Sequence, residues 1–258
     1  MGNHFKIIVP FYNVEQWIKM TIKSVQLQGY KDFECILIDD VSTDKSFSIA
    51  EEEIKDDDRF TIVKNKKKKY VLKNISDAIS LSNPSKDDVI VILDGDDWFA
   101  SKDVLSILYE VYEKEHCWLT YGSYVEYPSN TKGKFMRGKF AKKVHQHIID
   151  NNLFRESPWM TSHLRTWKYG LWQGVDQERS FSEPNVIDSK NHFANCWDLA
   201  YMFPLLELAG PRIFFVPDIL YVYNRQNPLN VDKIDHNMQL LMEQKIRNME
   251  KYNPLKNL

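Results

Sequence analysis

The sequence has little of what marks secreted or membrane proteins. Its three cysteines, Cys35, Cys117 and Cys196, are widely separated and form neither a zinc-binding pattern nor a disulfide framework. No apolar run reaches the roughly 18 residues that span a bilayer, and the N-terminus lacks the apolar core of a signal peptide. We therefore expect a soluble, cytoplasmic protein without a transmembrane segment.

A strong excess of one charge is also missing. The chain has 34 Lys and Arg against 36 Asp and Glu, which leaves a formal net charge of −2. Such a balance provides no general attraction to nucleic acid, so we expect no nucleic-acid partner. Aromatic residues, in contrast, make up 13% of the chain, which argues against disorder and suits a site that stacks on rings.

Strand and helix patterns alternate in the first half. Short apolar runs that predict buried strands are separated by segments with apolar residues at helical spacing. This order predicts an α/β fold with a Rossmann-like, mostly parallel central sheet flanked by helices. The expected strands are 5–9, 33–38, 60–63 and 89–93.

The second half is less regular. A helix is expected over 199–209, stopped by Gly210 and Pro211. A polar tail helix is expected to follow, with Ile234, Met238 and Leu241 as its apolar stripe. Between residues 155 and 200 the sequence is rich in Trp, His and Arg, and it shows little periodicity.

Three acids directly follow the last expected strand of the first half. Asp94, Asp96 and Asp97 lie at its C-terminal end, where open α/β sheets bind ligands. Acids packed this closely repel one another unless a cation or solvent relieves them. Mg²⁺ or Mn²⁺ bound to substrate phosphates would do so, and an acidic, solvent-exposed turn is the alternative.

Three sequence blocks together resemble the signature of the family 2 glycosyltransferases, which have the GT-A fold. They are Ile8-Val9-Pro10-Phe11-Tyr12-Asn13, Leu37-Ile38-Asp39-Asp40-Val41-Ser42-Thr43-Asp44 and Leu93-Asp94-Gly95-Asp96-Asp97, in this order and each at the end of an apolar strand. The resemblance implies an inverting glycosyltransferase that moves a sugar from a nucleotide-sugar donor, a UDP-sugar, to a hydroxyl acceptor. It further implies a single GT-A domain over 1–258, with a donor-binding half, 1–125, and an acceptor-binding half with C-terminal helices, 126–258.

The resemblance also assigns the donor site. The metal, Mn²⁺ or Mg²⁺, is expected on Asp96 and Asp94, and Gly95 is expected to let the backbone pass closely by the diphosphate. Asp40 is expected to accept a hydrogen bond from the base, while Asp39 shares that role or caps the next helix. The complete set of expected donor contacts is Pro10, Tyr12, Asp39, Asp40, Lys73, Asn74, Asp94 and Gly95. Pro10 is equally consistent with a strand terminator.

Asp198 is the candidate general base. An acceptor hydroxyl is a poor nucleophile until its proton is removed, and inverting relatives carry a carboxylate before a helix like 199–209. The alternative is an N-cap aspartate for that helix. His163, Arg165 and Trp197 are candidate contacts to acceptor or phosphate, with a structural histidine or a metal ligand as alternatives for His163.

The sequence departs from the family pattern at two places. Val41 replaces the usual Gly, so we expect a differently shaped loop after the second strand. Val71-Leu72-Lys73-Asn74 replaces the usual Ala-Arg-Asn block, and Lys73 is expected to stand in for the arginine as a point charge. The run Lys66 to Lys69 predicts a solvated loop, and the alternative is that one of these lysines is functional, because the run lies near the expected phosphate site.

Two other functions remain open. One is a decayed glycosyltransferase-like binding module, and the other is a sugar nucleotidyltransferase. The second normally needs a Gly-rich loop after the first strand, where this chain has Pro10 to Asn13. The acceptor class (glycan, protein or small molecule) and the existence of a homo-oligomer are left undecided.

Overall fold

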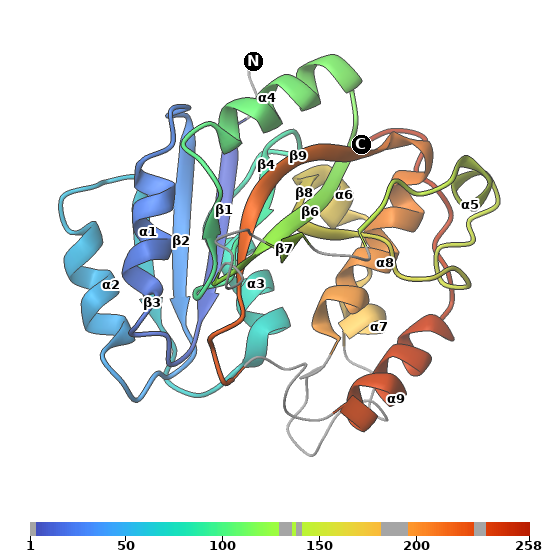
Figure 1. Cartoon of the computed structure of the whole chain (residues 1–258). Coiled ribbons are helices and arrows are strands. Elements are labelled where there is room, and N and C mark those ends of the chain that lie inside the picture. Colours follow the sequence, from blue (N-terminus) through green and yellow to red (C-terminus); the bar gives the residue numbers. More distant parts are fainter. Residues whose placement is uncertain (1–3, 129–135, 138–140, 182–195, 230–235) are drawn as a thin grey trace.

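The computed structural model describes residues 4–128, 136–137, 141–181, 196–229 and 236–258. The described strands form one sheet in the order β3-β2-β1-β4-β8-β6-β9-β5, with β7 paired to β6 (Figure 1). The strands are β1 Phe5–Phe11, β2 Phe33–Asp39, β3 Phe60–Lys64, β4 Val89–Ile92, β5 Trp98–Phe99, β6 Leu119–Tyr127, β7 Met136–Arg137, β8 Ser162–Lys168 and β9 Ile213–Asn224.

Helices connect these strands. They are α1 Ile18–Gln26, α2 Ser46–Ile54, α3 Tyr70–Leu81, α4 Val104–Glu115, α5 Gln146–Asp150, α6 Tyr169–Gln173, α7 Gln177–Phe181, α8 Trp197–Ala209 and α9 His236–Arg247, with a 3₁₀ turn over Gly210–Arg212. Within the described residues, no helix combines the length and apolar character needed to cross a bilayer. The predicted α/β class and the alternation of strands and helices in the first half are confirmed.

The first four strands form a parallel sheet whose edge carries the acids. β1 pairs in parallel with β2 and β4, and β2 pairs in parallel with β3. Pro10 lies inside β1, so the strand-terminator alternative is wrong. The last pair of β1 with β4 is Ile8 with Ile92, so the missing N–H of Pro10 costs no hydrogen bond on that side.

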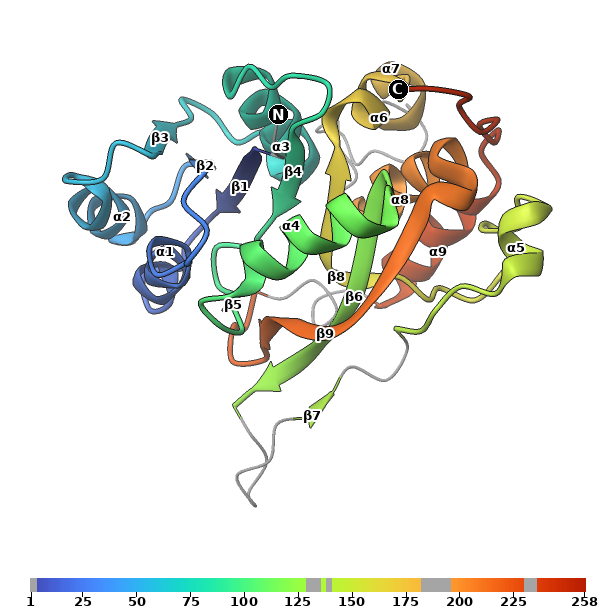
Figure 2. The ribbon, with the colours of Figure 1, turned by 90° about the horizontal axis from the view of Figure 1, so that it is seen from above.

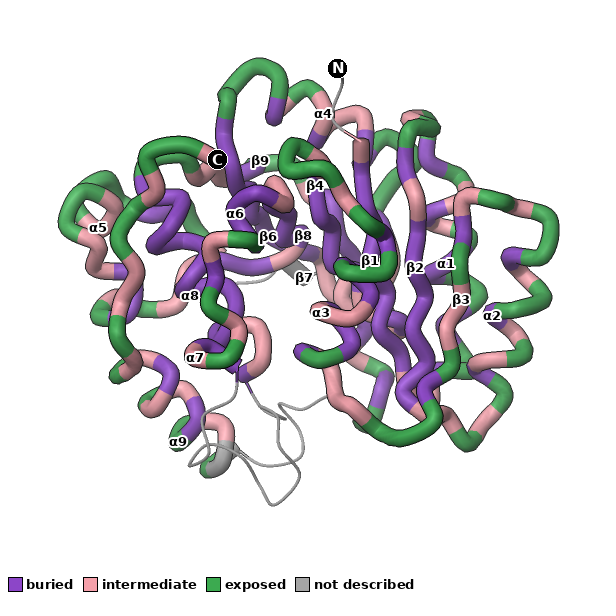
Figure 3. Tube along the Cα trace, turned by 180° about the vertical axis from the view of Figure 1, so that it is seen from behind, coloured by how far each residue is buried: buried purple, intermediate pink, exposed green. Residues whose placement is uncertain are grey.

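Hydrophobic side chains cover both faces of this sheet. Along β1, Ile8 belongs to one buried cluster, while Ile7 and Val9 belong to the other, because successive side chains of a strand point to opposite faces. Helices α1, α2 and α4 lie on one side, and α3, α6 and α8 lie on the other (Figure 2). β1, β2 and β4 are almost entirely buried, whereas in the edge strand β3 only Phe60 is buried (Figure 3). This two-sided burial explains why their sequences are continuous apolar runs.

The second half adds a mixed sheet to the parallel one. β8 pairs antiparallel with both β4 and β6, and β6 pairs in parallel with β9. β5 then pairs antiparallel with β9, which brings residues 98–99 beside residues 221–222. The sequence analysis predicted no strand in these segments, since polar residues interrupt the alternation. The added strands place residues 162–168 next to the acid-bearing strand β4.

The two C-terminal helices differ in burial. Nearly every residue of α8 is buried, from Leu199 to Ala209, which agrees with the expected helix over 199–209. In α9 the predicted apolar stripe is wrong at Leu241, which is 45% exposed, whereas Met242 and Ile246 are buried. Ile234 and the side chain of Met238 lie outside the described residues. The buried face of α9 is therefore set by an i, i+4 pair one residue further along.

Candidate active site

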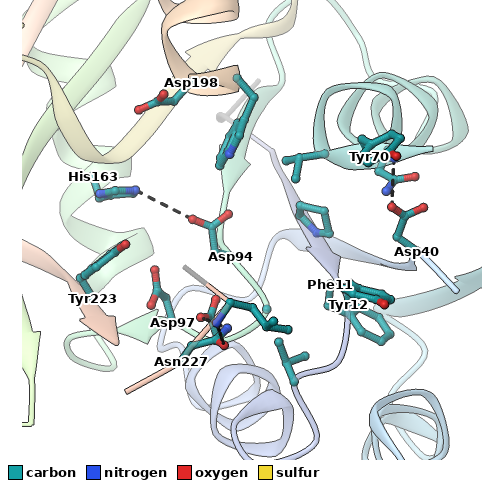
Figure 4. A pocket seen from close by; sticks show the side chains of 18 of the residues that line it. Phe11, Tyr12, Asp40, Tyr70, Asp94, Asp97, His163, Asp198, Tyr223 and Asn227 are labelled. Carbon is teal, nitrogen blue, oxygen red and sulfur yellow. Dashed lines mark hydrogen bonds and ion pairs between the residues drawn. The ribbon is translucent and has the colours of Figure 1, made fainter. Parts of the chain in front are cut away.

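A cavity of about 550 Å³ opens at the C-terminal edge of the parallel strands (Figure 4). Its size is typical of a small-molecule site. It is lined by residues from the ends of β1, β2 and β4, the start of α3, β8, α8, β9 and the segment after it. The lining includes Pro10, Phe11, Tyr12, Asp40, Lys68, Tyr70, Asn74, Asp94, Gly95, Asp96, Asp97, His163, Arg165, Cys196, Trp197, Asp198, Tyr223, Asn227 and Leu229.

Backbone hydrogen bonds join the segments that follow the parallel strands. Gly95 N donates to Pro10 O at 3.2 Å, and Asp40 N donates to Phe11 O at 2.9 Å. A Cβ atom on Gly95 would come within 2.4 Å of Phe11 Cβ, so only glycine fits between the acids and β1. This close approach fixes Asp94 and Asp96 against the end of β1.

Asp40 lines the cavity and also holds the loop that begins α3. Its Oδ1 accepts hydrogen bonds from Lys69 N at 2.7 Å and Asn65 Nδ2 at 3.1 Å, and its Oδ2 accepts from Tyr70 N at 2.9 Å. A carboxylate offers about four acceptor positions, so one remains for a ligand. Asn74 lines the cavity as well and accepts from Asn65 Nδ2 at 2.7 Å.

Two expected donor contacts lie outside the described cavity lining. Asp39 is fully buried, and its Oδ1 accepts from Ser42 N at 3.0 Å, so it shapes the turn after β2. Lys73 is paired with Asp77 on the outer face of α3. Lys68, which the sequence analysis placed in a solvated loop, lines the cavity with its ammonium 3.2 Å from the centroid of the Tyr12 ring. No local signal distinguished Lys68 from the other lysines of the run.

Two acids of the cavity lining, Asp94 and Asp97, have pKa values raised chiefly by burial. Burial, followed by the neighbouring charge of Asp96, raises the pKa of Asp94 to about 7. Its side chain is 22% exposed, and Oδ2 lies 3.9 Å from His163 Nε2. The Tyr221 hydroxyl oxygen lies 3.3 Å from the same oxygen. Close, partly desolvated carboxylates of this kind favour a bound cation.

Asp97 and Asp96 are tied to the second half of the chain. Tyr221 donates to Asp97 Oδ2 at 2.6 Å, and Asn224 N donates to Asp97 Oδ1 at 2.7 Å. Asp97 therefore anchors β9 to the segment that follows β4. Asp96 Oδ2 accepts from Asn227 Nδ2 at 2.7 Å. The sequence analysis did not identify Asn227.

A divalent cation fits Asp94 and Asp96. Among the described residues, no group of three or more His, Cys, Asp or Glu side chains is arranged as a complete metal site. Mg²⁺ sites commonly use one or two carboxylates, with substrate phosphates and water as the remaining ligands. Burial and mutual repulsion of the two acids, visible in the raised pKa of Asp94, match this kind of site.

The opposite wall of the cavity is built around Arg165. Its NH2 donates to Asp198 Oδ2 at 2.9 Å, and its NH1 donates to His163 Nε2 at 3.3 Å. Burial and Arg165 hold the pKa of His163 well below its usual value, so His163 is neutral at pH 7. Its ring stacks on Tyr221, with centroids 4.4 Å apart. In this arrangement, the hydrogen bond from Arg165 uses the lone pair of His163 Nε2 that a metal ion would need.

Asp198 lies in the first turn of α8. The N-cap is Cys196, which makes no side-chain capping hydrogen bond, so the N-cap alternative for Asp198 is wrong. The Asp198 carboxylate faces the cavity, across from Asp94 (Figure 4). Trp197 lines the cavity beside it and stacks on Tyr201. Trp167 and Trp172, in contrast, are core residues.

Val41 takes the backbone conformation that favours glycine. Its φ is +67°, in the left-handed region. Val41 therefore adopts a conformation in which glycine is usual, and the expected change in loop shape stays a prediction. A β-branched residue is strained in this region.

An open sheet with a ligand-sized cavity at the C-terminal ends of its parallel strands is the arrangement in which α/β folds bind small ligands. The family model described as glycosyl transferase family 2 matches residues 6–173. The chain belongs to this family, which confirms the resemblance of its three sequence blocks.

Two curated relatives are glycosyltransferases of Streptococcus pneumoniae. GlyG is 24% identical over 230 residues, which cover 88% of this chain and 72% of GlyG. GlyA is 22% identical over 218 residues, which cover 84% of this chain but only 30% of GlyA. The chain thus spans less than a third of GlyA.

Solved structures support the GT-A fold. S. aureus TarS 1–349 in complex with UDP-GlcNAc has a TM-score of 0.63 at 18% identity, over 87% of this chain and 59% of that one. The mannosyltransferase PcManGT from Pyrobaculum calidifontis, in complex with GDP-Man and Mn²⁺, has a TM-score of 0.57 at 15% identity, over 86% and 57%. At these identities, the likeness establishes the fold alone.

Proposed function

We propose that this chain is an inverting, metal-assisted glycosyltransferase that moves a sugar from a UDP-sugar to a hydroxyl acceptor. The observation that carries the proposal is a single cavity lined by Asp94 and Asp96 on one wall and Asp198 on the facing wall. TarS, which shares the fold, was solved with UDP-GlcNAc, and this supports a UDP-sugar donor.

The first half of the chain, 1–125, would bind the donor. Asp40 has one acceptor position left for a base N–H, and Gly95 leaves room for the diphosphate. Asp94 and Asp96 would hold Mn²⁺ or Mg²⁺, and PcManGT was solved with Mn²⁺. A cation bound there supplies Lewis-acid stabilisation of the charge on the departing nucleoside diphosphate.

The second half, 126–258, would bind the acceptor and activate it. Asp198 takes the proton from the acceptor hydroxyl, whose oxygen forms a new bond to the anomeric carbon of the sugar. The bond from that carbon to the diphosphate oxygen breaks on the opposite face, and its electron pair leaves with the nucleoside diphosphate. Arg165 holds the Asp198 carboxylate in place, and Trp197 offers a ring beside it.

Two features favour an enzyme over a decayed binding module. Asp40, Asp94, Asp96 and Asp198 are all present, and all face the same cavity.

A cytoplasmic location is part of the proposal, supported by three free, buried cysteines.

Calorimetry with UDP, with and without Mn²⁺, tests the proposal. We expect UDP to bind and Mn²⁺ to tighten its binding. A panel of UDP-sugars scored by slow hydrolysis would then identify the sugar. The proposal fails if UDP and other nucleoside diphosphates do not bind and Mn²⁺ makes no difference. Release of pyrophosphate from a nucleoside triphosphate and a sugar phosphate would favour a nucleotidyltransferase instead.

A further inference from the structure

Lys68 stands out among the lysines near the cavity. Its ammonium lies 3.2 Å from the centroid of the Tyr12 ring and 5.9 Å from that of Tyr70. Lys69 and Lys73 both form ion pairs with Asp77. Lys68, in contrast, makes no ion pair within the described part of the chain. Among the described residues, the interactions of its exposed side chain are these two cation–π contacts, which are weak at exposed sites.

The backbone around Lys68 is anchored while its side chain is exposed. Asn65 N donates to Asp39 O at 3.0 Å, and the backbone N–H groups of Lys69 and Tyr70 donate to Asp40. These bonds fix both ends of the loop to the edge of the sheet. The lysine side chain can therefore change rotamer without any movement of the loop.

The positive charge of Lys68 matters because acidic side chains dominate the cavity lining. Five acids line the described cavity, and the only lysine and arginine of its lining are Lys68 and Arg165. Arg165 is paired with Asp198 at 2.9 Å. Lys68 is thus the basic residue in this lining that has no acidic partner. A site that takes a diphosphate next to several carboxylates needs such a charge.

We propose that Lys68 leaves the Tyr12 ring when the donor binds and pairs with the donor's diphosphate. This inference rests on the proposed function, and it gives Lys68 the role that was expected of Lys73. A charge-assisted hydrogen bond to a phosphate oxygen is stronger than a cation–π contact at an exposed lysine. The exchange also uncovers the face of Tyr12, on which the aromatic base of the nucleotide can stack.

Binding of UDP and of uridine to three proteins tests the exchange. The proteins are the wild type, Lys68→Ala and, as a matched control, Lys67→Ala, which removes an exposed lysine of the same loop that does not line the cavity. We expect Lys68→Ala to weaken UDP binding by about tenfold to a hundredfold, the range for a charged hydrogen bond. Uridine should bind Lys68→Ala at least as well as the wild type. Lys67→Ala should match the wild type with both ligands.

Two further measurements sharpen the result. Lys68→Arg, which retains the charge, should recover most of the UDP affinity. Added salt should shrink the difference between the wild type and Lys68→Ala, because it screens an exposed charge contact. Equal melting temperatures would show that the loss is not a folding defect.

The outcomes separate this inference from the proposed function. If Lys68→Ala binds UDP as tightly as Lys67→Ala, only the role of Lys68 is overturned. If Lys68→Ala weakens UDP and uridine by the same factor, Lys68 supports the base and not the diphosphate, and the inference also falls. If wild-type protein binds no nucleoside diphosphate, both proposals fall together.

Discussion

Residues 5–97 and residues 119–227 contribute to one sheet and one cavity, yet they bring side chains to it by different routes. In the first region the acids lie at or just beyond the ends of strands: Asp40 is the first residue after β2, and Asp94 is the second residue after β4. In the second region Arg165 projects from within β8, and Asp198 lies in the first turn of α8. These two side chains are 33 residues apart in sequence and 2.9 Å apart in space.

The difference reflects two kinds of structural constraint. Parallel strands end at the same edge of a sheet, so the residues that follow them lie close together regardless of the conformation of the connecting loops. In the mixed region, convergence depends on the register of β8 between β4 and β6 and on the packing of α8. The four predictions below test whether the first region holds the cation and the second region supplies the general base. They run from the largest expected effect to the smallest.

Asp198→Asn should remove the general base that the second region is proposed to supply. We expect turnover to fall by about a hundredfold to ten-thousandfold, the range for loss of a general base. UDP affinity should stay nearly unchanged, because asparagine can still accept a hydrogen bond from Arg165. Transfer rates and UDP calorimetry on the same protein would check both parts.

Asp218→Asn is the control for this change, because Asp218 is exposed on β9 and outside the described cavity lining. It should retain wild-type turnover. An Asp198→Asn variant that keeps most of its activity but loses several degrees of melting temperature would assign Asp198 to helix stability and place the base elsewhere.

Asp96→Asn should weaken Mn²⁺-dependent UDP binding as well as rate, since it removes a charged ligand. The second region takes part through Asn227, which donates to Asp96 at 2.7 Å. We expect Asn227→Ala to lower Mn²⁺ affinity by about tenfold to a hundredfold, as is usual for a residue that orients a metal ligand. Titration of Mn²⁺ by electron paramagnetic resonance would measure both variants. If Asn227→Ala binds Mn²⁺ as tightly as the wild type, Asn227 does not orient Asp96 for the cation, and only the first region contributes to the cation site.

The raised pKa of Asp94 predicts how stability depends on pH. Folded protein holds this proton up to about pH 7, whereas the unfolded chain releases it near the ordinary value of 3.8. Between these values the folded state binds more protons, so stability falls as the pH rises through that window. Asp94→Asn should therefore melt higher than wild type at about pH 8 and similarly at about pH 4. A shift of roughly 2–4 °C corresponds to about 1 kcal/mol in a domain of this size.

Mn²⁺ provides the internal control for the Asp94 prediction. At pH 8 it should raise the melting temperature of the wild type, because a cation offsets the repulsion between Asp94 and Asp96. It should raise that of Asp94→Asn much less. Identical pH profiles for the two proteins would contradict the assignment of the raised pKa to Asp94.

Val41→Gly should give the smallest effect, a gain of about 1 kcal/mol in the free energy of unfolding. A side chain in the left-handed region costs about 1–2 kcal/mol, and the added freedom of glycine in the unfolded chain offsets part of the gain. Urea denaturation would measure it. Val111→Gly, in the middle of α4 and without a positive φ, should lose stability instead. A loss in both variants would show that the turn after β2 tolerates valine without strain.

The sequence by itself determined the fold class, the parallel strands and the acids at their ends. The expected strand 33–38 and the observed β2, Phe33–Asp39, differ by one residue, and the expected 89–93 and β4, Val89–Ile92, differ by one as well. Continuous β-branched runs predict buried parallel strands because that environment covers both faces. The residues that follow such strands then need no further information to reach the common edge.

Only the tertiary structure decided which neighbour of a pair faces the cavity. Asp39 points into the protein and Asp40 into the cavity, because successive side chains of an extended chain alternate in direction. Lys73 lies on the outer face of α3 with Asp77, one helical turn further on, while Lys68 reaches Tyr12 across the loop. Contacts between segments that are distant in sequence, such as Arg165 with Asp198, depend on strand register and helix packing, which no local pattern encodes.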